Sequence, residues 1–378
     1  MYRKNRNLYL LVILIVILLF SFLTIYASSS VASTLKVSAR AGVLYEPETD
    51  SFLFAKNADV RLPMASTTKI MTAVISIENA SLAELVEIDE EAVGIEGSSA
   101  YLKSGDVLTV EELLYALLLS SANDAAAALA YHISGSIEAF ADLMNEKADE
   151  LGLTNTHFTN PHGLDNEEHY TSAADLARLA GYALKNETLK TISSTYKKSF
   201  ITEERSRTYV NHNKLLNMYD GVIGMKTGFT KRSGRCLVGA AERDGLTFVT
   251  VTLDAPNDWN DHKTMLDYGY ATLEKLTLAD VGDFSYDIKL LDGTKSSVRV
   301  TNTEGCSMIL PKGEYDVEEF VKLSRYTVAP ISEGDILGKV IFTVNGEVSG
   351  EVSLVCSESV GVRTEKGFFR KIYDRIFG

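Results

Sequence analysis

The spacing of apolar and polar residues predicts a mixed domain of strands and helices from about Ser38 to Leu276. Stretches in which apolar and polar residues alternate indicate strands, whereas apolar residues three and four positions apart indicate amphipathic helices. By this criterion we expect two short strands within 41–57, helices at 66–79, 108–133 and 172–185, two long strands within 234–255, and a helix at 258–276. Such a mixture is typical of an α/β fold.

Side-chain caps support two of these helices. Thr109 precedes the apolar run of the long second helix, and Glu112 follows three residues later, which is the spacing of a capping box. Thr171 or Ser172 is suited to cap the next helix. These caps indicate where both helices begin.

The residues after about Asp283 predict a second, all-β module. Short runs that alternate apolar and polar residues follow one another here, and turn residues separate them. The predicted organisation is an N-terminal segment at 1–33, a first domain at 34–276, a β-rich domain at 283–361 and a C-terminal segment at 365–378.

The N-terminal segment has the pattern of an export signal. Arg3, Lys4 and Arg6 precede a run of uncharged residues, and small residues suited to cleavage after about Ala32 follow it. The apolar run is also long enough for an uncleaved membrane anchor, which is the alternative. In both cases we expect the rest of the chain outside the cytoplasm, because the positive charges hold the N-terminus inside.

The C-terminal segment predicts a short basic amphipathic helix. Its apolar residues recur at helical spacing and its basic residues occupy other positions around the helix. The apolar set is Phe369, Ile372, Tyr373, Ile376 and Phe377, and the basic set is Lys366, Arg370, Lys371 and Arg375. Such a helix can lie on an anionic membrane surface, or it can dock on its own β-rich domain.

Charge and cysteine content narrow the functional classes. The 378 residues carry a net charge of −14, which argues against nucleic acid as a partner. The cysteines are Cys236, Cys306 and Cys356, and no CxxC motif indicates a metal site. Cys306 and Cys356 can be either a disulfide pair or separate thiols.

Ser66 and Lys69 carry the first chemical signal. At a helix start, residues three apart share a face, so the lysine amine can approach the serine hydroxyl. A serine becomes a strong nucleophile when a base takes its proton, and a lysine is such a base when burial and neighbouring cations keep it neutral. The free backbone N–H groups of a helix N-terminus can help to hold an oxyanion.

The S-x-x-K motif is weak evidence by itself. It also occurs at Ser33/Lys36 and at Ser194/Lys197. The first of these lies beside the expected cleavage region, and the second has no apolar helix behind it. An ordinary helix cap would explain an isolated S-x-x-K, so further motifs are needed.

Two further motifs follow in the chain. Ser121 and Asn123 lie in a stretch of small residues, where a hydroxyl and an amide two positions apart can relay a proton and bind a substrate amide. Taken by itself, this motif is explained as well by a polar break between two helices. Lys226-Thr227-Gly228 is the only K-T-G in the chain and precedes the two long strands. There the lysine and the threonine could bind a carboxylate, and the glycine would let the substrate backbone approach closely.

The three motifs in this order are far more specific than any one of them. Together with the blocks LFAKNADVRLPMASTTKIMTA, SSANDAAAALA, TNPHGLD and DGVIGMKTGFT, they make the chain resemble the serine-type D-alanyl-D-alanine carboxypeptidases, the low-molecular-weight penicillin-binding proteins. The likeness runs from about Ser38 to Leu276. The trailing β-rich domain and amphipathic end also match the usual layout of that family.

This resemblance implies a fold and an activity. The fold would be a β-lactamase-like or transpeptidase-like catalytic domain, with an antiparallel sheet, helices on both sides and a helical subdomain, followed by a small all-β domain. The enzyme would remove the terminal D-alanine from peptidoglycan pentapeptide stems at the outer face of the bacterial cytoplasmic membrane. β-Lactams would acylate the same serine, and no cofactor would take part.

The resemblance also implies a role for each motif residue. Carried over position by position, Ser66 would be the nucleophile, Lys69 the general base, and Ser121 the group that passes a proton to the leaving D-alanine. Asn123 would bind the substrate amide, Lys226 and Thr227 the terminal carboxylate, and Gly228 would let the substrate approach closely. The backbone N–H groups of Ser66 and Phe229 would form the oxyanion hole. Loss of one oxyanion donor typically costs about 3–4 kcal/mol of transition-state stabilisation.

The sequence departs from the family pattern at three points. Ala122 replaces the glycine that often separates the serine and the asparagine, and Phe229 stands where many relatives have histidine. Residues 254–270 contain no evident arginine for a second carboxylate contact. We expect the site to tolerate the Ala122 methyl group, and we leave the second carboxylate contact unassigned.

The histidines suggest other chemistry that we do not favour. His162 invites a serine–histidine triad, but Lys69 already supplies a base, so we expect a turn histidine whose polar atoms are bonded locally. His157, His162 and His169 have no common zinc-ligand spacing, and we expect no metal.

Two other functions compete with the carboxypeptidase. A serine β-lactamase shares the three motifs, but no glutamate block of the class A type lies between Asn123 and Lys226. A catalytically inert wall-binding relative would have no chemical need for Lys69, and a polar relay in a cleft is costly to keep for packing alone.

Overall fold

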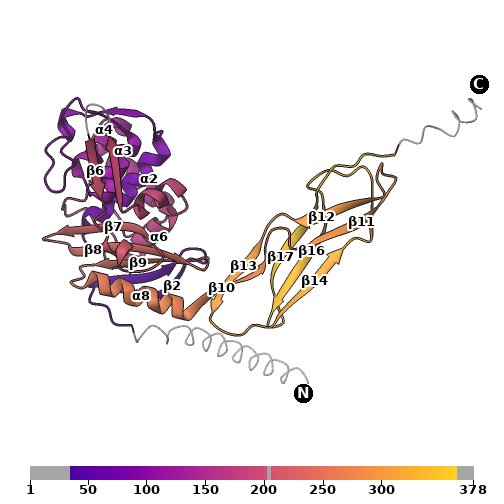
Figure 1. Cartoon of the computed structure of the whole chain (residues 1–378). Helices are drawn as coiled ribbons and strands as arrows, with labels where there is room; N and C mark the ends of the chain where they lie inside the picture. The colour runs from indigo at the N-terminus through magenta and orange to yellow at the C-terminus, as the bar shows by residue number, and fades with distance from the viewer. Residues whose placement is uncertain (1–34, 202–205, 364–378) are drawn as a thin grey trace, which may run out of the picture. The chain divides into compact units, whose positions relative to one another are not determined.

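The computed structural model describes residues 35–201 and 206–363 (Figure 1). The chain divides into two compact units between Tyr270 and Ala271. The predicted export signal at 1–33 and the predicted amphipathic helix at 365–378 lie outside the described residues. Among the described residues, every helix is too short or too polar to span a membrane.

An antiparallel sheet of five strands forms the centre of the first unit. Its strands lie in the order β2-β1-β9-β8-β7. Their bounds are β1 Ala41–Glu46, β2 Ser51–Lys56, β7 Val222–Thr230, β8 Gly234–Arg243 and β9 Leu246–Leu253. The two predicted strand pairs are thereby confirmed, and β7, which carries the K-T-G motif, lies at one edge of the sheet.

Helices cover both faces of this sheet (Figure 1). On one side, α2 Lys69–Asn79, α3 Val110–Leu119, α6 Ala173–Ala183 and α7 Glu187–Ser194 contact strands of the sheet, and α8 Asp258–Thr272 lies on the other side. η1 Ala65–Thr68 precedes α2, and α4 Asn123–Ser134 and α5 Ile137–Glu150 pack against α2. Short elements connect them: β3 Leu85–Glu87, η2 Glu90–Ala92, β4 Val107–Thr109, β5 Lys197–Ile201, β6 Ser206–Val210 and η3 Lys214–Asn217. This is the predicted layered α/β architecture.

Both predicted caps are present. The Thr109 hydroxyl accepts a hydrogen bond from the backbone N–H of Glu112, and the Ser172 hydroxyl accepts one from Asp175 N–H. The structure therefore selects Ser172 over Thr171. These bonds satisfy backbone donors that have no partner within the first turn of a helix.

Two of the predicted helices have different bounds in the structure. The helix expected at 108–133 is broken between Leu119 and Asn123, because Ser121 has a φ of 60° that interrupts helical geometry. The helix expected to reach Leu276 ends at Thr272. Its last residues instead start β10, Leu273–Ala279, which pairs with a strand more than 25 residues further on.

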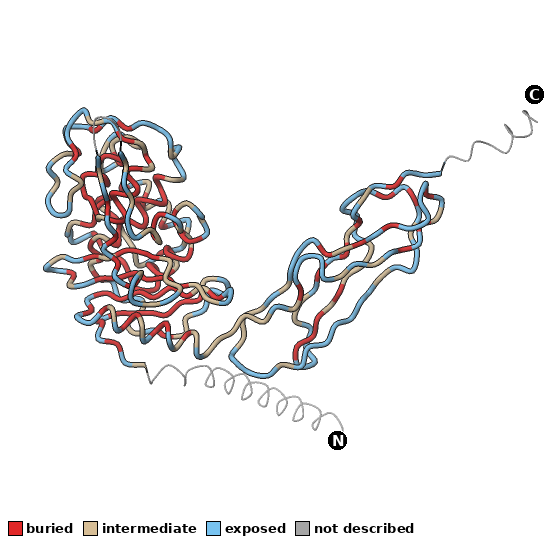
Figure 2. Tube along the Cα trace, in the orientation of Figure 1, coloured by how far each residue is buried: buried red, intermediate tan, exposed pale blue. Residues whose placement is uncertain are grey.

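The core of the first unit lies between the sheet and the helices on each side (Figure 2). Small alanines of α4 pack in its centre, and Ala125, Ala126 and Ala127 are fully buried. On the other face, the His262 ring of α8 is bonded to the hydroxyls of Thr250 and Thr252 on β9. The sheet is thus held from both sides, which fixes the position of β7.

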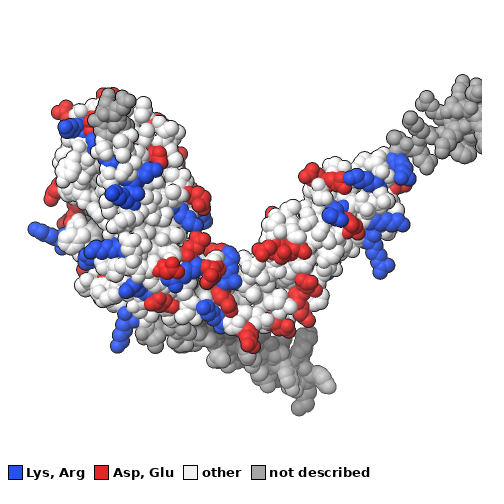
Figure 3. Space-filling model, in the orientation of Figure 1, with Lys and Arg blue, Asp and Glu red and all other residues white. Residues whose placement is uncertain are grey.

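Charged residues of both signs are interspersed on the face of the first unit seen in Figure 3. A continuous basic patch is the electrostatic feature that nucleic-acid binding requires. The visible face of this unit carries no such patch, in keeping with its excess of acidic residues.

The second unit is all β, as the sequence predicts. A six-stranded sheet has the order β14-β16-β17-β12-β11-β15, and β10 pairs with β13. The further bounds are β11 Ser285–Leu291, β12 Ser297–Asn302, β13 Cys306–Pro311, β14 Val317–Leu323, β15 Tyr326–Val328, β16 Ile336–Val344 and β17 Glu347–Cys356. Cys306 and Cys356 are separate thiols rather than a disulfide pair.

Candidate active site

Ser66 lies in the tight turn η1 that leads into α2. Ala65, directly before it, has a φ of 48°, a conformation that costs an alanine energy and persists only where neighbours hold it. The Thr68 hydroxyl donates to the carbonyl of Ala65 and is bonded in turn to the ring of His169. The turn that carries Ser66 is therefore fixed by contacts on both sides.

Lys69, the first residue of α2, is fully buried next to Ser66. Its amine lies 3.0 Å from the Ser66 hydroxyl oxygen, 2.7 Å from the side-chain oxygen of Asn123 and 2.5 Å from the backbone carbonyl of His162. The structure thus brings together the predicted nucleophile, the predicted base and the predicted amide-binding residue.

Burial lowers the pKa of Lys69 well below its ordinary value, and the nearby cation of Lys226 lowers it further. Asp124 acts in the opposite direction. Lys226 is itself buried, and this desolvation lowers its pKa to about 7. A lysine whose amine is neutral at neutral pH has the free lone pair that a general base requires.

Ser121 and Asn123 lie at the break between α3 and α4. Asn123 is the first residue of α4, and its side-chain oxygen accepts the Lys69 bond. Ser121 is buried in the turn before it, but it is not among the hydrogen-bond partners of Lys69 within the described residues. Ala122 has a φ of −63°, which any residue adopts, so its methyl group is tolerated as expected.

The K-T-G motif lies on the edge strand β7, against the turn that carries Ser66. A Cβ placed on Gly228 would lie 3.1 Å from the backbone nitrogen of Ser66 and 3.2 Å from the Ala65 methyl group. The absence of a side chain at Gly228 therefore leaves the Ser66 N–H accessible beside the strand. The N–H of Phe229 follows directly in the chain, as a two-donor oxyanion hole requires.

The block around His162 contributes to the site through its backbone, which sequence reasoning missed. The His162 carbonyl accepts the Lys69 bond, and the Pro161 carbonyl accepts a bond from the Thr72 hydroxyl of α2. The His162 side chain accepts locally from the N–H of Leu164, and burial lowers its pKa to about 3. This is the locally bonded turn histidine that the sequence predicts.

Comparison with known proteins agrees with this geometry. A family model described as D-alanyl-D-alanine carboxypeptidase matches residues 28–257. The chain belongs to this family. A second model, described as the C-terminal domain of penicillin-binding protein 5, matches residues 274–362, which correspond to the all-β unit.

Named carboxypeptidases resemble the chain over most of its length. D-alanyl-D-alanine carboxypeptidase DacF of Bacillus subtilis is 35% identical over 340 residues, which cover 87% of each protein. DacC of Escherichia coli is 31% identical and the match covers 93% of this chain and 90% of DacC. The crystal structure of penicillin-binding protein 5 from Haemophilus influenzae matches with a TM-score of 0.63 and 29% identity, over 86% of this chain and 98% of that one.

Membership of the carboxypeptidase family makes this chain a serine-type D-alanyl-D-alanine carboxypeptidase, a hydrolase. The predicted fold class is confirmed as well, because its solved relatives are enzymes of the same kind. The chemistry of the family requires a nucleophile, a base and groups that bind the substrate. The described residues around Ser66 supply candidates for each.

One candidate that sequence reasoning missed in this carboxypeptidase is Arg235. It is the cross-strand partner of Phe229, so both side chains project from the same face of the sheet as Thr227. One guanidinium nitrogen donates to both carboxylate oxygens of Asp258 on α8, at 2.9 and 2.8 Å. The Arg235 side chain is 43% exposed, whereas that of Asp258 is 3% exposed.

The sequence held a signal for this residue. The arginine sought within 254–270 is absent there, but Arg235 stands on the second strand of the hairpin that begins with K-T-G. If the hairpin turn is known, counting the same number of residues along each strand from the turn places Arg235 opposite Phe229. The sequence alone does not fix the turn.

Proposed function

We propose that Ser66 is acylated by peptidoglycan stem peptides that end in D-Ala-D-Ala, with release of the terminal D-alanine. The observation that carries this proposal is the 3.0 Å contact between the Ser66 hydroxyl and the buried Lys69 amine, whose pKa is held well below its ordinary value. Without a neutral amine at this distance, the serine would stay a weak nucleophile at neutral pH.

In the acylation step, Lys69 takes the hydroxyl proton as the Ser66 oxygen bonds to the carbonyl carbon of the penultimate D-alanine. The N–H groups of Ser66 and Phe229 stabilise the oxyanion that forms. The C–N bond then breaks, and the leaving D-alanine amine takes a proton through Ser121. The products of this step are free D-alanine and an ester on Ser66.

In the deacylation step, a water molecule gives a proton to the same relay and attacks the ester carbonyl carbon. The ester C–O bond breaks, the Ser66 oxygen regains a proton, and the shortened peptide leaves with a new carboxylate. No cofactor is needed for either step, because each is a proton and acyl transfer.

Three side chains are suited to hold the terminal carboxylate of the substrate. Lys226 is a buried residue of the edge strand β7, Thr227 follows it, and Arg235 presents a partly exposed guanidinium on the Thr227 face. Asp258 occupies one nitrogen of that guanidinium, which leaves the other donors for a carboxylate. Arg235 is our candidate for the second carboxylate contact that the sequence left unassigned.

The ends of the chain extend this proposal to location. The apolar run after Arg6 would direct export, as a cleaved signal or as an anchor, and the segment 365–378 would bind an anionic membrane surface. The enzyme would then work at the outer face of the cytoplasmic membrane. Cosedimentation of the full chain with anionic and with neutral vesicles, with and without residues 365–378, tests the second part.

The decisive experiment is intact-mass analysis of the purified full chain after incubation with benzylpenicillin, followed by peptide mapping and by measurement of D-alanine release from a pentapeptide. We expect a stable adduct on Ser66 and release of D-alanine. Ser66→Ala should lose both, with a change in stability of no more than about 1 kcal/mol. Ser194→Ala, which alters another S-x-x-K serine, is the matched control and should keep both.

Other outcomes separate the alternatives. Rapid loss of benzylpenicillin without an adduct would favour the β-lactamase. Intact drug without an adduct and without D-alanine release would favour an inert wall-binding protein. Equal labelling of Ser66→Ala and the wild type would overturn the assignment of the nucleophile.

A further inference from the structure

The loop from Glu96 to Leu102 is fastened to the residue that we expect to bind the substrate amide. The backbone N–H of Asn123 donates to the carbonyl of Ser98 at 2.7 Å, and its side-chain amide donates to the carbonyl of Glu96 at 2.5 Å. Gly97 lies between them, and a Cβ there would come within 2.8 Å of the Asn123 amide nitrogen. The start of the loop therefore lies in direct contact with the active site.

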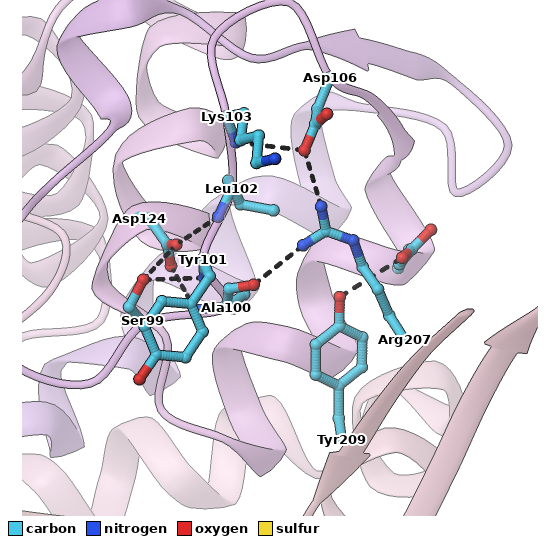
Figure 4. Close-up of polar contacts among 10 residues, drawn as sticks. Ser99, Ala100, Tyr101, Leu102, Lys103, Asp106, Asp124, Arg207 and Tyr209 are labelled. Atoms are coloured by element: carbon cyan, nitrogen blue, oxygen red, sulfur yellow. Dashed lines mark hydrogen bonds and ion pairs between the residues drawn. The ribbon is translucent and has the colours of Figure 1, made fainter. Parts of the chain in front are cut away.

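The next residues of the loop are held by Asp124, which follows Asn123 in α4 (Figure 4). Its carboxylate is buried and accepts from the Ser99 hydroxyl at 2.6 Å, from Ala100 N–H at 2.9 Å and from Leu102 N–H at 3.0 Å. Hydrogen bonds to a charged acceptor are among the strong ones, so these bonds fix the path of the loop.

Arg207 of β6 holds the loop from its other side. The guanidinium donates to the carbonyl of Ala100 at 2.9 Å and to the carboxylate of Asp106 at 2.7 Å (Figure 4). Its side chain is mostly buried. Residues on both sides of position 101 are thus bonded to α4, to β6 or to both.

Tyr101 is displayed to solvent at the centre of this rigid loop. Its side chain is 82% exposed, whereas its neighbour Leu102 is buried. Its φ of 57° is a conformation that bulky residues seldom adopt. In Figure 4 the Tyr101 ring extends away from Arg207. A strained backbone that holds a large exposed aromatic ring gains nothing in packing, and such positions cluster at ligand clamps.

We propose that Tyr101 binds the part of the stem peptide that lies beyond its last three residues and so sets the preference for stem length. This inference rests on the proposed function, in which Asn123 holds an amide on the acyl side of the scissile bond. A peptide that continues beyond Asn123 next meets the loop bonded to that residue. A tyrosine ring offers an apolar face to aliphatic side chains and a hydroxyl to peptide amides.

The position of the loop favours peptide over sugar as the occupant. Tyr101 is flanked by residues whose N–H groups bond to Asp124, which directly follows Asn123, so its loop is joined to the segment that we propose binds the substrate amide. The glycan is attached at the far end of the stem. A peptide residue therefore reaches Tyr101 before any sugar does.

The test compares two substrates on the full-length enzyme. One is the free five-residue stem peptide, and the other is an N-acetylated tripeptide with the same D-Ala-D-Ala end. Tyr101→Ala and Tyr101→Asn both remove the ring, and asparagine tolerates a positive φ. For the stem peptide we expect KM to rise about tenfold with kcat unchanged, since one aromatic contact contributes an effect of this order. For the tripeptide and for benzylpenicillin acylation we expect wild-type values.

The controls are Tyr101→Phe and Tyr326→Ala. The first keeps the ring and should retain most of the affinity, and the second removes an exposed tyrosine of the all-β unit and should change neither substrate. An equal loss for both substrates in the Tyr101 variants, or a stem-peptide KM within twofold of wild type, would overturn the proposal. A glycan-linked stem, measured in parallel, tests the sugar. An effect seen with that substrate alone would overturn the proposal in favour of a sugar contact.

The two proposals fail in different ways. If the wild-type enzyme releases no D-alanine from either substrate, the proposed function fails and this inference falls with it. If the wild type is active and its Tyr101 variants show the same ratio of KM values for the two substrates, only the proposed role of Tyr101 is wrong.

Discussion

Gly228 lies against the backbone nitrogen of Ser66, so the edge strand β7 and the turn that carries Ser66 meet with no side chain between them. The ideal Cβ position at Gly228 is 3.1 Å from both Ser66 N and the carbonyl oxygen of Met64. These neighbours are backbone atoms in a buried turn, and they move only if the turn moves with them. The accessibility of the Ser66 N–H therefore depends on the absence of a side chain on β7.

A methyl group at this position should slow acylation. In Gly228→Ala, the strand and the turn must separate by a few tenths of an ångström, which displaces the oxyanion donors. We expect benzylpenicillin acylation to fall by about 10²-fold or more, with a stability loss of about 1–3 kcal/mol from overpacking. Stopped-flow acylation and urea unfolding measure the two effects. Gly361→Ala, where a Cβ meets nothing, is the control, and wild-type acylation in Gly228→Ala would contradict the argument.

A second glycine supports the same turn from the other side. Gly163 has a φ of +87°, and a Cβ there would fall 2.0 Å from the Ala65 carbonyl oxygen. Backbone strain alone would cost Gly163→Ala about 1–3 kcal/mol of stability, and the steric clash should add to this cost. The variant should also lose acylation, because the clash displaces the Ser66 turn. Gly105→Ala shares a positive φ of +78° but meets no atom within 4 Å, so it isolates the strain term. Equal stability of the two variants in urea unfolding would refute the steric explanation.

Burial of Lys226 predicts a pH dependence of stability. Its pKa is about 7 in the folded chain, below the ordinary value of 10.5, so between these values the unfolded chain binds more protons. The free energy of unfolding should therefore rise as the pH increases from about 7 to 10.5. Below about pH 7, the full cost of burying a protonated lysine lowers the stability of the fold. Lys226→Met should flatten this rise. Urea unfolding of the wild type and of Lys226→Met, measured between pH 7 and 10.5, tests this prediction. If stability rises equally steeply with pH in both proteins, Lys226 is not the cause of the rise.

The same pKa predicts a pH dependence of substrate binding. Lys226 is protonated below about pH 7 and neutral above it, so it attracts the substrate carboxylate more strongly in the acidic range. We expect KM for D-Ala-D-Ala peptides to rise as pH increases through about 7. A peptide that ends in a carboxamide should not show this rise. Identical pH profiles for the two peptides would exclude Lys226 as the source.

Arg235 should contribute to carboxylate recognition. Arg235→Gln should reduce the preference for a free carboxylate over a carboxamide by about tenfold to a hundredfold, because a hydrogen bond to a charged group is lost. The ratio of kcat/KM for the two peptides measures this preference. Arg299→Gln is the control, since Arg299 pairs with Asp287 on the all-β unit. An unchanged ratio in Arg235→Gln would show that the arginine only braces α8.

Local patterns in the sequence were sufficient for most of the catalytic unit. Strand pairs, helix caps and the three motifs depend on neighbours within a few residues, and Thr109 and Ser172 cap helices as predicted. At Ser121 and Asn123 the sequence allowed either a functional pair or a polar break between two helices, while leucine and alanine on each side favoured a continuous helix. In the structure the two helices are separated where Ser121 has a φ of 60°, and the N–H of Asn123 is bonded to the distant carbonyl of Ser98.

The parts that sequence reasoning missed depend on contacts between residues far apart in the chain. α8 ends at Thr272 because the next residues pair with β13, and a helical pattern contains no information about that partner. His162 contributes a backbone carbonyl, which every residue type carries, so its identity gives no signal. Arg235 lies opposite Phe229 through the register of β7 and β8, which a single sequence does not fix.

The two buried lysines lower the stability of the fold, although the proposed chemistry needs them. Lys69 and Lys226 have lost nearly all contact with water, and neither forms an ion pair within the described residues. Apolar side chains of similar shape would fit the same interior without the cost of desolvation. A search for heat-resistant variants that ignores activity should therefore enrich substitutions at these two positions. The variants with the highest unfolding temperatures would then be proteins without carboxypeptidase activity.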